Sequence, residues 1–402
     1  MANVIIVGAG PAGASLAFLL ARRGIGVTLV ERQTDFAREF RGEVLMPSAF
    51  EGLAQMGLAE AVAKVPQVPL RTAQAFILGR RVFRTTLDTS RGTGHPPSWV
   101  SQPGLLEMLV AQAERFPGFR LERGATVRDL LRREDRTVGV RVKTPDGERE
   151  LTGDLVVGAD GRASVVRRRS GIEAHTDRTL MDIVWCKVPL PEFMASDPHL
   201  RAYLGHGHLL IVAPTPDRRL QLGWVIQKGN FGELRSRGLS EWMEELANHV
   251  SPDLAEHLRT HKDETIRPFL LDAVADRVET WSAPGLLLIG DAAHTMSPVG
   301  AQGLNIAIRD AIVAANHLVP ALTGAADPQT LDGATEEIER ERLPEVRAIQ
   351  RLQAIPPYVI LSNSWWSKLV LRAVPSFLIG RAGSSAAFQR FAYGVTEVNL
   401  RV

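Results

Sequence analysis

The stretch VIIVGAGPAGASLAFLLARRGIGVTLVER, residues 4–32, decides the fold of this chain. An apolar run within residues 3–7 predicts a strand that is buried on both faces. Residues 14–23 have the composition of a helix, which a glycine soon afterwards ends. Residues 27–30 predict a second strand. The order strand, helix, strand, with a short first turn, indicates an α/β fold.

The first turn of this unit carries the glycine spacing of a dinucleotide-binding site. Gly8, Gly10 and Gly13 follow the pattern G-x-G-x-x-G. The first glycine permits a tight turn, the second lets a pyrophosphate approach the backbone, and the third lets helix and strand pack closely. Glu31 follows the second strand, at a position where a carboxylate accepts hydrogen bonds from an adenosine ribose. We expect this ribose end of the cofactor to be the more exposed one. A purely structural glycine turn is the weaker interpretation, and the pattern does not distinguish FAD from NAD.

A second stretch, LLLIGDAAHTMSPVGAQGLNIAIRDA, spans residues 286–311. Its first four residues predict a buried strand that ends at Gly290-Asp291, and a loop containing Pro298 follows. From Leu304 onward, apolar residues recur at helical spacing. The stretch therefore brings one carboxylate close to one helix N-terminus, whose dipole favours negative charge. The alternative is that Asp291 only caps the helix.

The composition is that of an ordinary folded chain and excludes several classes of protein. The 402 residues are 45% hydrophobic and 23% charged, with a formal net charge of +2. The length indicates two domains or one large domain with an insertion, and so small a charge gives no reason to expect a nucleic-acid partner. Cys186, expected to be a small buried residue, is the only cysteine. No disulfide within the chain is therefore possible, and we expect a cytoplasmic protein with no metal site.

The predicted elements also suggest how the chain is divided. Short β-like runs dominate from about residue 176 to 280, and the strand near 286 returns to the style of the N-terminal part. Further predicted elements are helices at 53–62 and 105–114 and a hairpin at 138–152. We predict a discontinuous nucleotide-binding domain (1–75, 101–175 and 281–343), a mainly antiparallel substrate-binding sheet domain (76–100 and 176–280) and a C-terminal helical cap (344–402).

A third motif completes a resemblance to a known family. LVVGADGRASVVR, residues 155–167, places Asp160-Gly161 at the end of a buried strand. With the glycine-rich turn before it and the late Gly-Asp motif after it, the chain resembles the single-component flavoprotein aromatic hydroxylases, whose type member is para-hydroxybenzoate hydroxylase. The resemblance covers at least residues 1–170 and 280–318. It implies a Rossmann-like, three-layer FAD-binding domain into which the sheet domain is inserted.

The resemblance also implies which residues contact FAD. Asp291 would lie near the ribityl chain, and the backbone N–H groups that open the following helix would face the pyrimidine edge of the flavin. FRGEVL, residues 40–45, resembles the mobile-flavin loop of the family, so Arg41 would face the pyrophosphate. The Asp160-Gly161 segment would help to hold FAD and to admit the nicotinamide cofactor. The full set of predicted cofactor-binding residues is Gly8, Gly10, Pro11, Ala12, Gly13, Glu31, Arg32, Arg41, Gln102, Val127, Asp160, Gly161, Asp291, Pro298, Gly303, Leu304 and Asn305.

The activity that the resemblance implies is that of an FAD-dependent monooxygenase reduced by NADH or NADPH. It would insert one oxygen atom from O2 into a small aromatic or other electron-rich substrate through a flavin hydroperoxide. The substrate would lie between the inserted sheet and the flavin, because ligand sites favour domain interfaces. Two alternatives stay open: an FAD-dependent reductase or dehydrogenase of the same fold, such as a prenyl-chain reductase, and a non-catalytic metabolite-binding flavoprotein. The substrate, the choice of nicotinamide and the oligomeric state do not follow from the sequence.

No side chain is assigned as a catalyst. His294 lies in the late motif, where we favour a structural hydrogen bond over a catalytic base. Trp185 and Trp224 are expected in the core of the sheet domain rather than in a pocket. Three further polar residues lie in the inserted sheet, namely Tyr203, His206 and His208. For each of them, a role at the surface or at a strand edge is as well supported as contact with the substrate.

The segment PPYVILSNSWWSKLVLRAVPSFLIGRAG, residues 356–383, combines aromatic and basic residues. Leu361, Trp365 and Leu369 are spaced to share one helical face. Such a face can bind a membrane surface. An apolar face is more often buried within its own protein, so we favour a cap that closes the substrate cavity.

Overall fold

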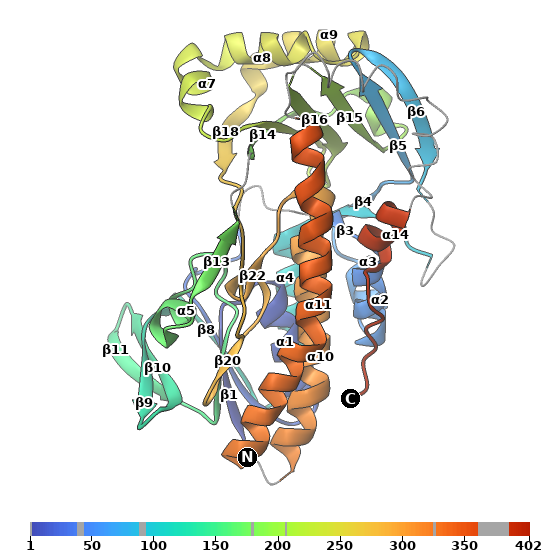
Figure 1. Ribbon diagram of the computed structural model, residues 1–402. Coiled ribbons are helices and arrows are strands. Elements are labelled where there is room, and N and C mark those ends of the chain that lie inside the picture. Colours follow the sequence, from blue (N-terminus) through green and yellow to red (C-terminus); the bar gives the residue numbers. More distant parts are fainter. Residues whose placement is uncertain are drawn as a thin grey trace.

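The protein is described here by a computed structural model that covers residues 2–37, 44–87, 94–177, 181–205, 207–324, 327–360 and 386–402. Figure 1 shows two main sheets, one near the N-terminus and one beneath a layer of three helices at the opposite end. A long helix, α11 (Pro328–Ile360), runs from the first sheet toward the second. This architecture confirms the predicted α/β fold with an inserted, mainly antiparallel sheet and a C-terminal helical segment.

The sheet near the N-terminus has six strands in the order β20-β21-β12-β1-β2-β8. Its strands are parallel except for the edge strand β20. Helices cover one face and a three-stranded antiparallel sheet covers the other, which explains why the central strands are apolar throughout. The strands are β1 (Asn3–Val7), β2 (Gly26–Glu31), β8 (Phe119–Arg123), β12 (Leu155–Gly158), β20 (Ser282–Ala283) and β21 (Leu286–Leu288). The covering elements are α1 (Pro11–Arg22), α4 (Gln102–Ala113), α10 (Gln302–Thr323), β9 (Thr126–Arg133), β10 (Arg136–Thr144) and β11 (Gly147–Thr152).

The second main sheet has seven strands in the order β18-β14-β17-β16-β15-β5-β6. Only the pair β15–β5 is parallel. One face packs under three helices, and the other face turns toward the six-stranded part. The strands are β5 (Thr72–Ile77), β6 (Arg80–Thr86), β14 (Met181–Pro189), β15 (His199–Gly205), β16 (His208–Pro214), β17 (Arg219–Gln227) and β18 (Ile266–Leu271). The helices are α7 (Phe231–Arg237), α8 (Leu239–Ala247) and α9 (Pro252–Thr260).

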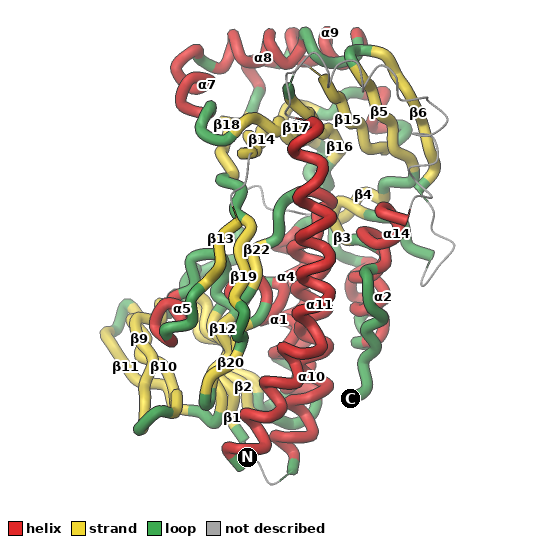
Figure 2. The backbone as a smooth tube through the Cα atoms, in the orientation of Figure 1, coloured by secondary structure: helices red, strands yellow, loops and turns green. Residues whose placement is uncertain are grey.

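Two small antiparallel sheets lie between the main ones, as the tube in Figure 2 shows. One contains β3 (Val44–Leu45), β7 (Ser98–Val100) and β4 (Gln67–Pro69), and the other contains β13 (Ala174–Asp177), β19 (Ala275–Val278) and β22 (His294–Thr295). The short helices are α5 (Val165–Ser170), α6 (Glu192–Ala195) and the 3-10 turns η1 (Lys262–Glu264), η2 (Gly290–Ala292) and η3 (Val299–Ala301).

Several predicted bounds differ from those of the structure. The helix predicted at 53–62 is two helices, α2 (Pro47–Gln55) and α3 (Ala59–Ala63), because Gly57 adopts a left-handed φ of 77° between them. The predicted domain ranges remain predictions, but three of their limits fall inside elements: residue 76 in β5, residue 176 in β13 and residue 344 in α11.

The C-terminal part is helical in α11 and α14 (Ala386–Tyr393) and then runs as a non-helical tail to residue 402. α11 continues through Pro344, where the sequence suggested a boundary. Most of segment 356–383 lies outside the described residues, including Leu361, Trp365 and Leu369. Within the described ranges, no helix has the length and apolar character needed to cross a bilayer.

Candidate cofactor site

The glycine-rich turn between β1 and α1 is fixed by steric contacts of its own backbone. Gly8 has a φ of 100°, and a Cβ added there would lie 2.4 Å from the carbonyl oxygen of Ala159. A Cβ at Gly13 would lie 2.0 Å from the carbonyl oxygen of Gly8. At Gly10, by contrast, an added Cβ would meet nothing within 4 Å. The outer glycines are thus needed for packing, and the middle one leaves open backbone in front of the N-terminus of α1, as a pyrophosphate requires.

Glu31 closes this turn from the end of β2. It is only 3% exposed, and its carboxylate accepts the backbone N–H groups of Ala9 and Gln33, each at 3.0 Å. The Glu31 side chain itself is therefore buried, and the expectation that the ribose end of FAD is the more exposed one remains a prediction. Arg32 beside it is exposed. Pro11 occupies the first turn of α1, where its fixed φ is compatible with a helix start.

Asp160 lies at the carboxyl end of β12, directly behind Gly8. Its carboxylate accepts the Ser164 hydroxyl at 2.5 Å and the N–H groups of Val165 and Val166 at 2.6 and 3.2 Å. Burial raises the pKa of this carboxyl, although these donors oppose the shift. The carboxylate therefore caps α5, and Gly161 follows with a φ of 82°. The role of this pair toward a cofactor remains a prediction.

The late motif completes the same edge of the six-stranded sheet. A Cβ added at Gly290 would lie 3.0 Å from Ala12, so the end of β21 touches the glycine-rich turn. The Asp291 side chain is 34% exposed, and its Oδ2 lies 3.4 Å from Nε of Arg162. Its Oδ1 would lie 4.0 Å from a Cβ added at Gly303, in the first turn of α10. Three motifs far apart in the sequence thus meet where β1, β12 and β21 end.

The remaining predicted residues have more varied surroundings. Gln102 begins α4 and is 8% exposed, and its Oε1 has no hydrogen-bond partner among the described residues. Val127 is buried in β9. Asn305 is fully buried, and its side chain accepts the Met46 N–H at 2.7 Å and donates to two carbonyl groups. Leu304 is 7% exposed, Pro298 precedes η3, and Arg41 lies outside the described residues.

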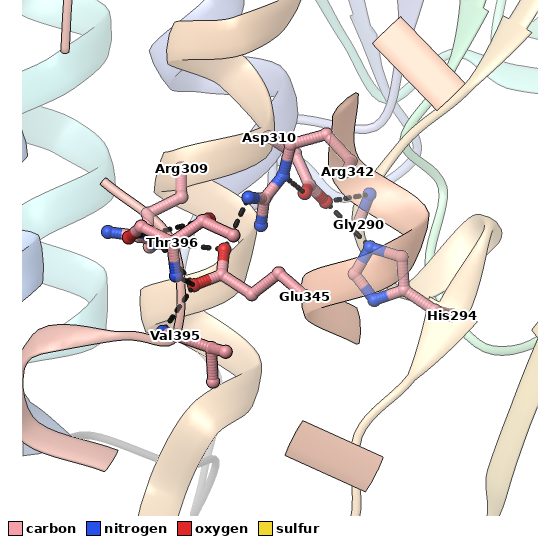
Figure 3. Close-up of polar contacts among 8 residues, drawn as sticks. All are labelled: Gly290, His294, Arg309, Asp310, Arg342, Glu345, Val395 and Thr396. Atoms are coloured by element: carbon pink, nitrogen blue, oxygen red, sulfur yellow. Dashed lines mark hydrogen bonds and ion pairs between the residues drawn. The ribbon is translucent and has the colours of Figure 1, made fainter. Parts of the chain in front are cut away.

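A buried group of charges holds the late motif from behind, and the sequence analysis did not identify it (Figure 3). The Asp310 carboxylate accepts the Gly290 N–H at 3.0 Å, His294 Nε2 lies 2.7 Å away, and Arg342 donates to it at 2.8 Å. Asp310 and Arg342 have no exposed surface. Burial alone would raise the pKa of Asp310, but the charges of His294 and Arg342 hold it below its usual range. Asp310 therefore fixes the backbone from which Asp291 projects.

Glu345 links this group to the C-terminal tail. Its carboxylate pairs with Arg342, accepts Arg309 at 2.7 and 3.1 Å and accepts the Val395 N–H at 2.9 Å. Burial opposes ionisation, but the two guanidinium groups dominate and hold the pKa of Glu345 at about 2. Arg309 also donates to the carbonyl oxygen of Thr396 at 2.7 Å. Adjacent charges at 309 and 310 within a largely apolar helix are a sequence signal of this group.

Comparison with known proteins identifies the cofactor. The profile of the FAD binding domain family matches residues 1–351. The 6-methylpretetramide 4-monooxygenase of Streptomyces rimosus is 30% identical over 99% of this chain and 94% of its own length. The chain belongs to the family of FAD-dependent aromatic hydroxylases. It is therefore an FAD-dependent oxidoreductase, as predicted.

One further relative and two solved structures are similar to this chain. Rifampicin monooxygenase of Streptomyces venezuelae is 28% identical, with 89% of this chain and 73% of that protein covered. PqsL of Pseudomonas aeruginosa, described as a probable FAD-dependent monooxygenase, has a TM-score of 0.78 and 22% identity over 92% of this chain and 99% of its own. The p-nitrophenol 4-monooxygenase PnpA of Pseudomonas putida has a TM-score of 0.78 and 16% identity, with 98% and 99% covered. These two structures support the fold.

The weaker candidates of this family member are mostly structural. The hydrogen bond of His294 to Asp310 confirms its structural interpretation. Trp224 is 3% exposed and lies in the core under the three helices, as predicted, whereas Trp185 is 9% exposed and lies in the apolar cluster on the opposite face of the sheet. A surface or strand-edge role for Tyr203 is wrong, because it is 1% exposed and stacks on Phe76. His208 is likewise buried, with 7% of its surface exposed. His206 lies outside the described residues.

Tyr203 faces the helix-covered side of the seven-stranded sheet, away from the FAD site. Cys186 is fully buried on that side, and burial raises the pKa of its thiol.

Proposed function

We propose that this chain is a monooxygenase that takes electrons from NADH or NADPH and inserts one oxygen atom of O2 into an aromatic or other electron-rich organic substrate. The observation that carries the proposal is the meeting of the glycine-rich turn, the Gly290-Asp291 motif and the first turn of α10 at one edge of the six-stranded sheet. Several relatives are named as monooxygenases, among them 6-methylpretetramide 4-monooxygenase and an aromatic compound monooxygenase of Bacillus subtilis.

FAD, when bound, supplies the redox chemistry by accepting a hydride and activating O2. The chain's own residues bind and orient it. The open backbone at Gly10 and the N-terminus of α1 would hold the pyrophosphate. Asp291 would accept hydrogen bonds from the ribityl chain, and the N–H groups at Gly303 and Leu304 would lie at the pyrimidine edge. The predicted route through a flavin hydroperoxide remains a prediction.

The substrate would lie against the face of the seven-stranded sheet that turns toward this site. That face is apolar, and Trp99 and Trp185 meet on it edge to face with ring centroids 6.4 Å apart. A Cβ at Gly223 would lie 2.3 Å from the Trp185 ring, so this glycine leaves room for the indole. Val299, in the loop that leads into α10, packs against the same cluster. Such a surface favours a flat apolar substrate and excludes water, as transfer of an activated oxygen atom requires.

The test follows cofactor, electrons and oxygen separately. Purified protein should be yellow, and acid precipitation should release intact FAD into the supernatant. Oxidation of NADH and NADPH is then measured with a panel of phenolic and polycyclic aromatic compounds under 18O2. A product that carries one 18O atom supports the proposal. Nicotinamide oxidation that yields a reduced product without consumption of O2 would instead show a reductase.

A further inference from the structure

The loop that leads into α10 has a strained backbone. Gly300 and Ala301 are consecutive residues in the left-handed region, with φ values of 73° and 53°. Ala301 is a non-glycine residue in this region and immediately precedes the first turn of α10. A residue with a Cβ keeps this conformation only when its surroundings fix it. The structure should therefore contain groups that hold the loop.

One of these groups is Gln353, on α11. Its side chain is 1% exposed. The amide accepts the N–H of Ser297 at 3.1 Å and donates to the carbonyl oxygens of Ser297 at 2.8 Å and Val299 at 2.6 Å. One buried amide thus binds the backbone on both sides of Pro298, which has no N–H of its own.

The second group is Gln302, the first residue of α10, which is also 1% exposed. Its Nε2 donates to the carbonyl oxygens of Gly300 at 2.8 Å and Phe391 at 3.0 Å. The Phe391 ring lies against Gly300, where an added Cβ would be 2.9 Å from it. The loop is therefore held between α11 on one side and α14 on the other.

We propose that Gln353 and Gln302 form an amide clamp that fixes this loop and thereby sets the redox potential of bound FAD. Both are positioning residues, because they act through the backbone of residues 297–301 and not by touching the flavin. The physical reason is that reduction adds negative charge, which a fixed helix N-terminus stabilises. If the loop relaxes at Ala301, the first N–H groups of α10 turn away, and reduced FAD loses more binding free energy than oxidised FAD.

This inference rests on FAD binding and goes beyond the proposed monooxygenation. The test needs only the protein with its FAD, so it can succeed or fail independently of the substrate. The variants are Gln353→Met and Gln302→Met. The matched control is Gln55→Met, because the Gln55 amide also binds the C-terminal tail, accepting the Leu400 N–H at 2.6 Å and donating to Asn399 at 3.3 Å, but lies on α2.

The measurements are the midpoint potential of the bound flavin, the Kd for oxidised FAD and the melting temperature. We expect both clamp variants to lower the midpoint potential of the bound flavin. If a variant loses tenfold more affinity for reduced FAD than for oxidised FAD, the potential falls by about 30 mV. Gln55→Met should lower the melting temperature with the potential unchanged. Clamp variants that lose thermal stability but keep the wild-type potential would overturn the proposal. If Gln353→Met does not fold, Gln302→Met alone decides, since it leaves the bonds of Gln353 to Ser297 intact.

Discussion

The proposed FAD site has two sides, the glycine-rich turn of residues 8–13 and the late loop of residues 290–305, and they are held in different ways. The turn is fixed by local backbone contacts: Gly13 packs on Gly8, and Gly8 packs on Ala159. The late loop is fixed by buried side chains from distant parts of the chain, including Asp310 behind Gly290. One binding site can therefore be held rigid by close backbone packing on one side and by buried hydrogen bonds on the other.

The largest expected effect tests the steric side. Gly8→Ala should unfold the protein or lower its free energy of unfolding by more than about 4 kcal/mol, because the new Cβ meets backbone and the residue keeps a left-handed φ. Gly10→Ala is the matched variant, since its Cβ meets nothing. It should keep the stability of the FAD-free protein and lose FAD affinity. Chemical denaturation and FAD titration measure the two effects.

An unchanged FAD affinity in Gly10→Ala would mean that the pyrophosphate does not pass in front of this glycine. Equal losses of stability in both variants would remove the distinction between packing glycines and the open one.

The same contrast explains what the sequence could and could not predict. The glycine spacing and the apolar strands are local signals, so β1 and β2 were predicted almost residue by residue, whereas α1 begins at Pro11 rather than at residue 14. The clamp residue Gln353 and the partner Arg342 are separated from the late loop by tens of residues, and no local period links them to it. The sequence therefore predicts the position of Asp291 at the end of a strand but not the buried side chains that hold the loop after it.

The second effect tests the polar side. Arg342→Met leaves Asp310 and Glu345 buried with one guanidinium fewer, and such a loss costs about 3–5 kcal/mol of stability. The control is Arg340→Met, whose side chain is 68% exposed in its pair with Glu337. We expect no resolvable change there, because exposed pairs contribute little. Urea denaturation of both variants gives the comparison, and similar midpoints would show that the buried group does not stabilise the fold.

The third effect separates cofactor affinity from stability. Asp291→Ala should raise the Kd for FAD by about tenfold or more, as loss of a charge-assisted hydrogen bond worth about 1.5–3 kcal/mol requires. The stability of the FAD-free protein should be retained, because the Asp291 side chain is partly exposed and, among the described residues, makes only a long contact to Arg162. Glu31→Ala should lower both the affinity for FAD and the stability of the FAD-free protein, because it leaves the buried Ala9 N–H without the carboxylate that accepts its hydrogen bond. Fluorescence titration that finds an unchanged Kd in Asp291→Ala would assign that carboxylate a structural role.

The smallest effect compares Gly303 with Gly10 across the site. Gly303 lies in the first turn of α10, its φ is outside the left-handed region, and the nearest atom to an added Cβ is Asp291 Oδ1 at 4.0 Å. Gly303→Ala therefore removes backbone freedom without a clash and should stabilise the FAD-free protein by up to about 1 kcal/mol. The same methyl group points to the space beside Asp291, so FAD affinity should fall while stability rises. A variant that gains stability and binds FAD as tightly as the wild type would show that the first turn of α10 does not contact the flavin, and the site would then depend on the glycine-rich turn and Asp291 alone.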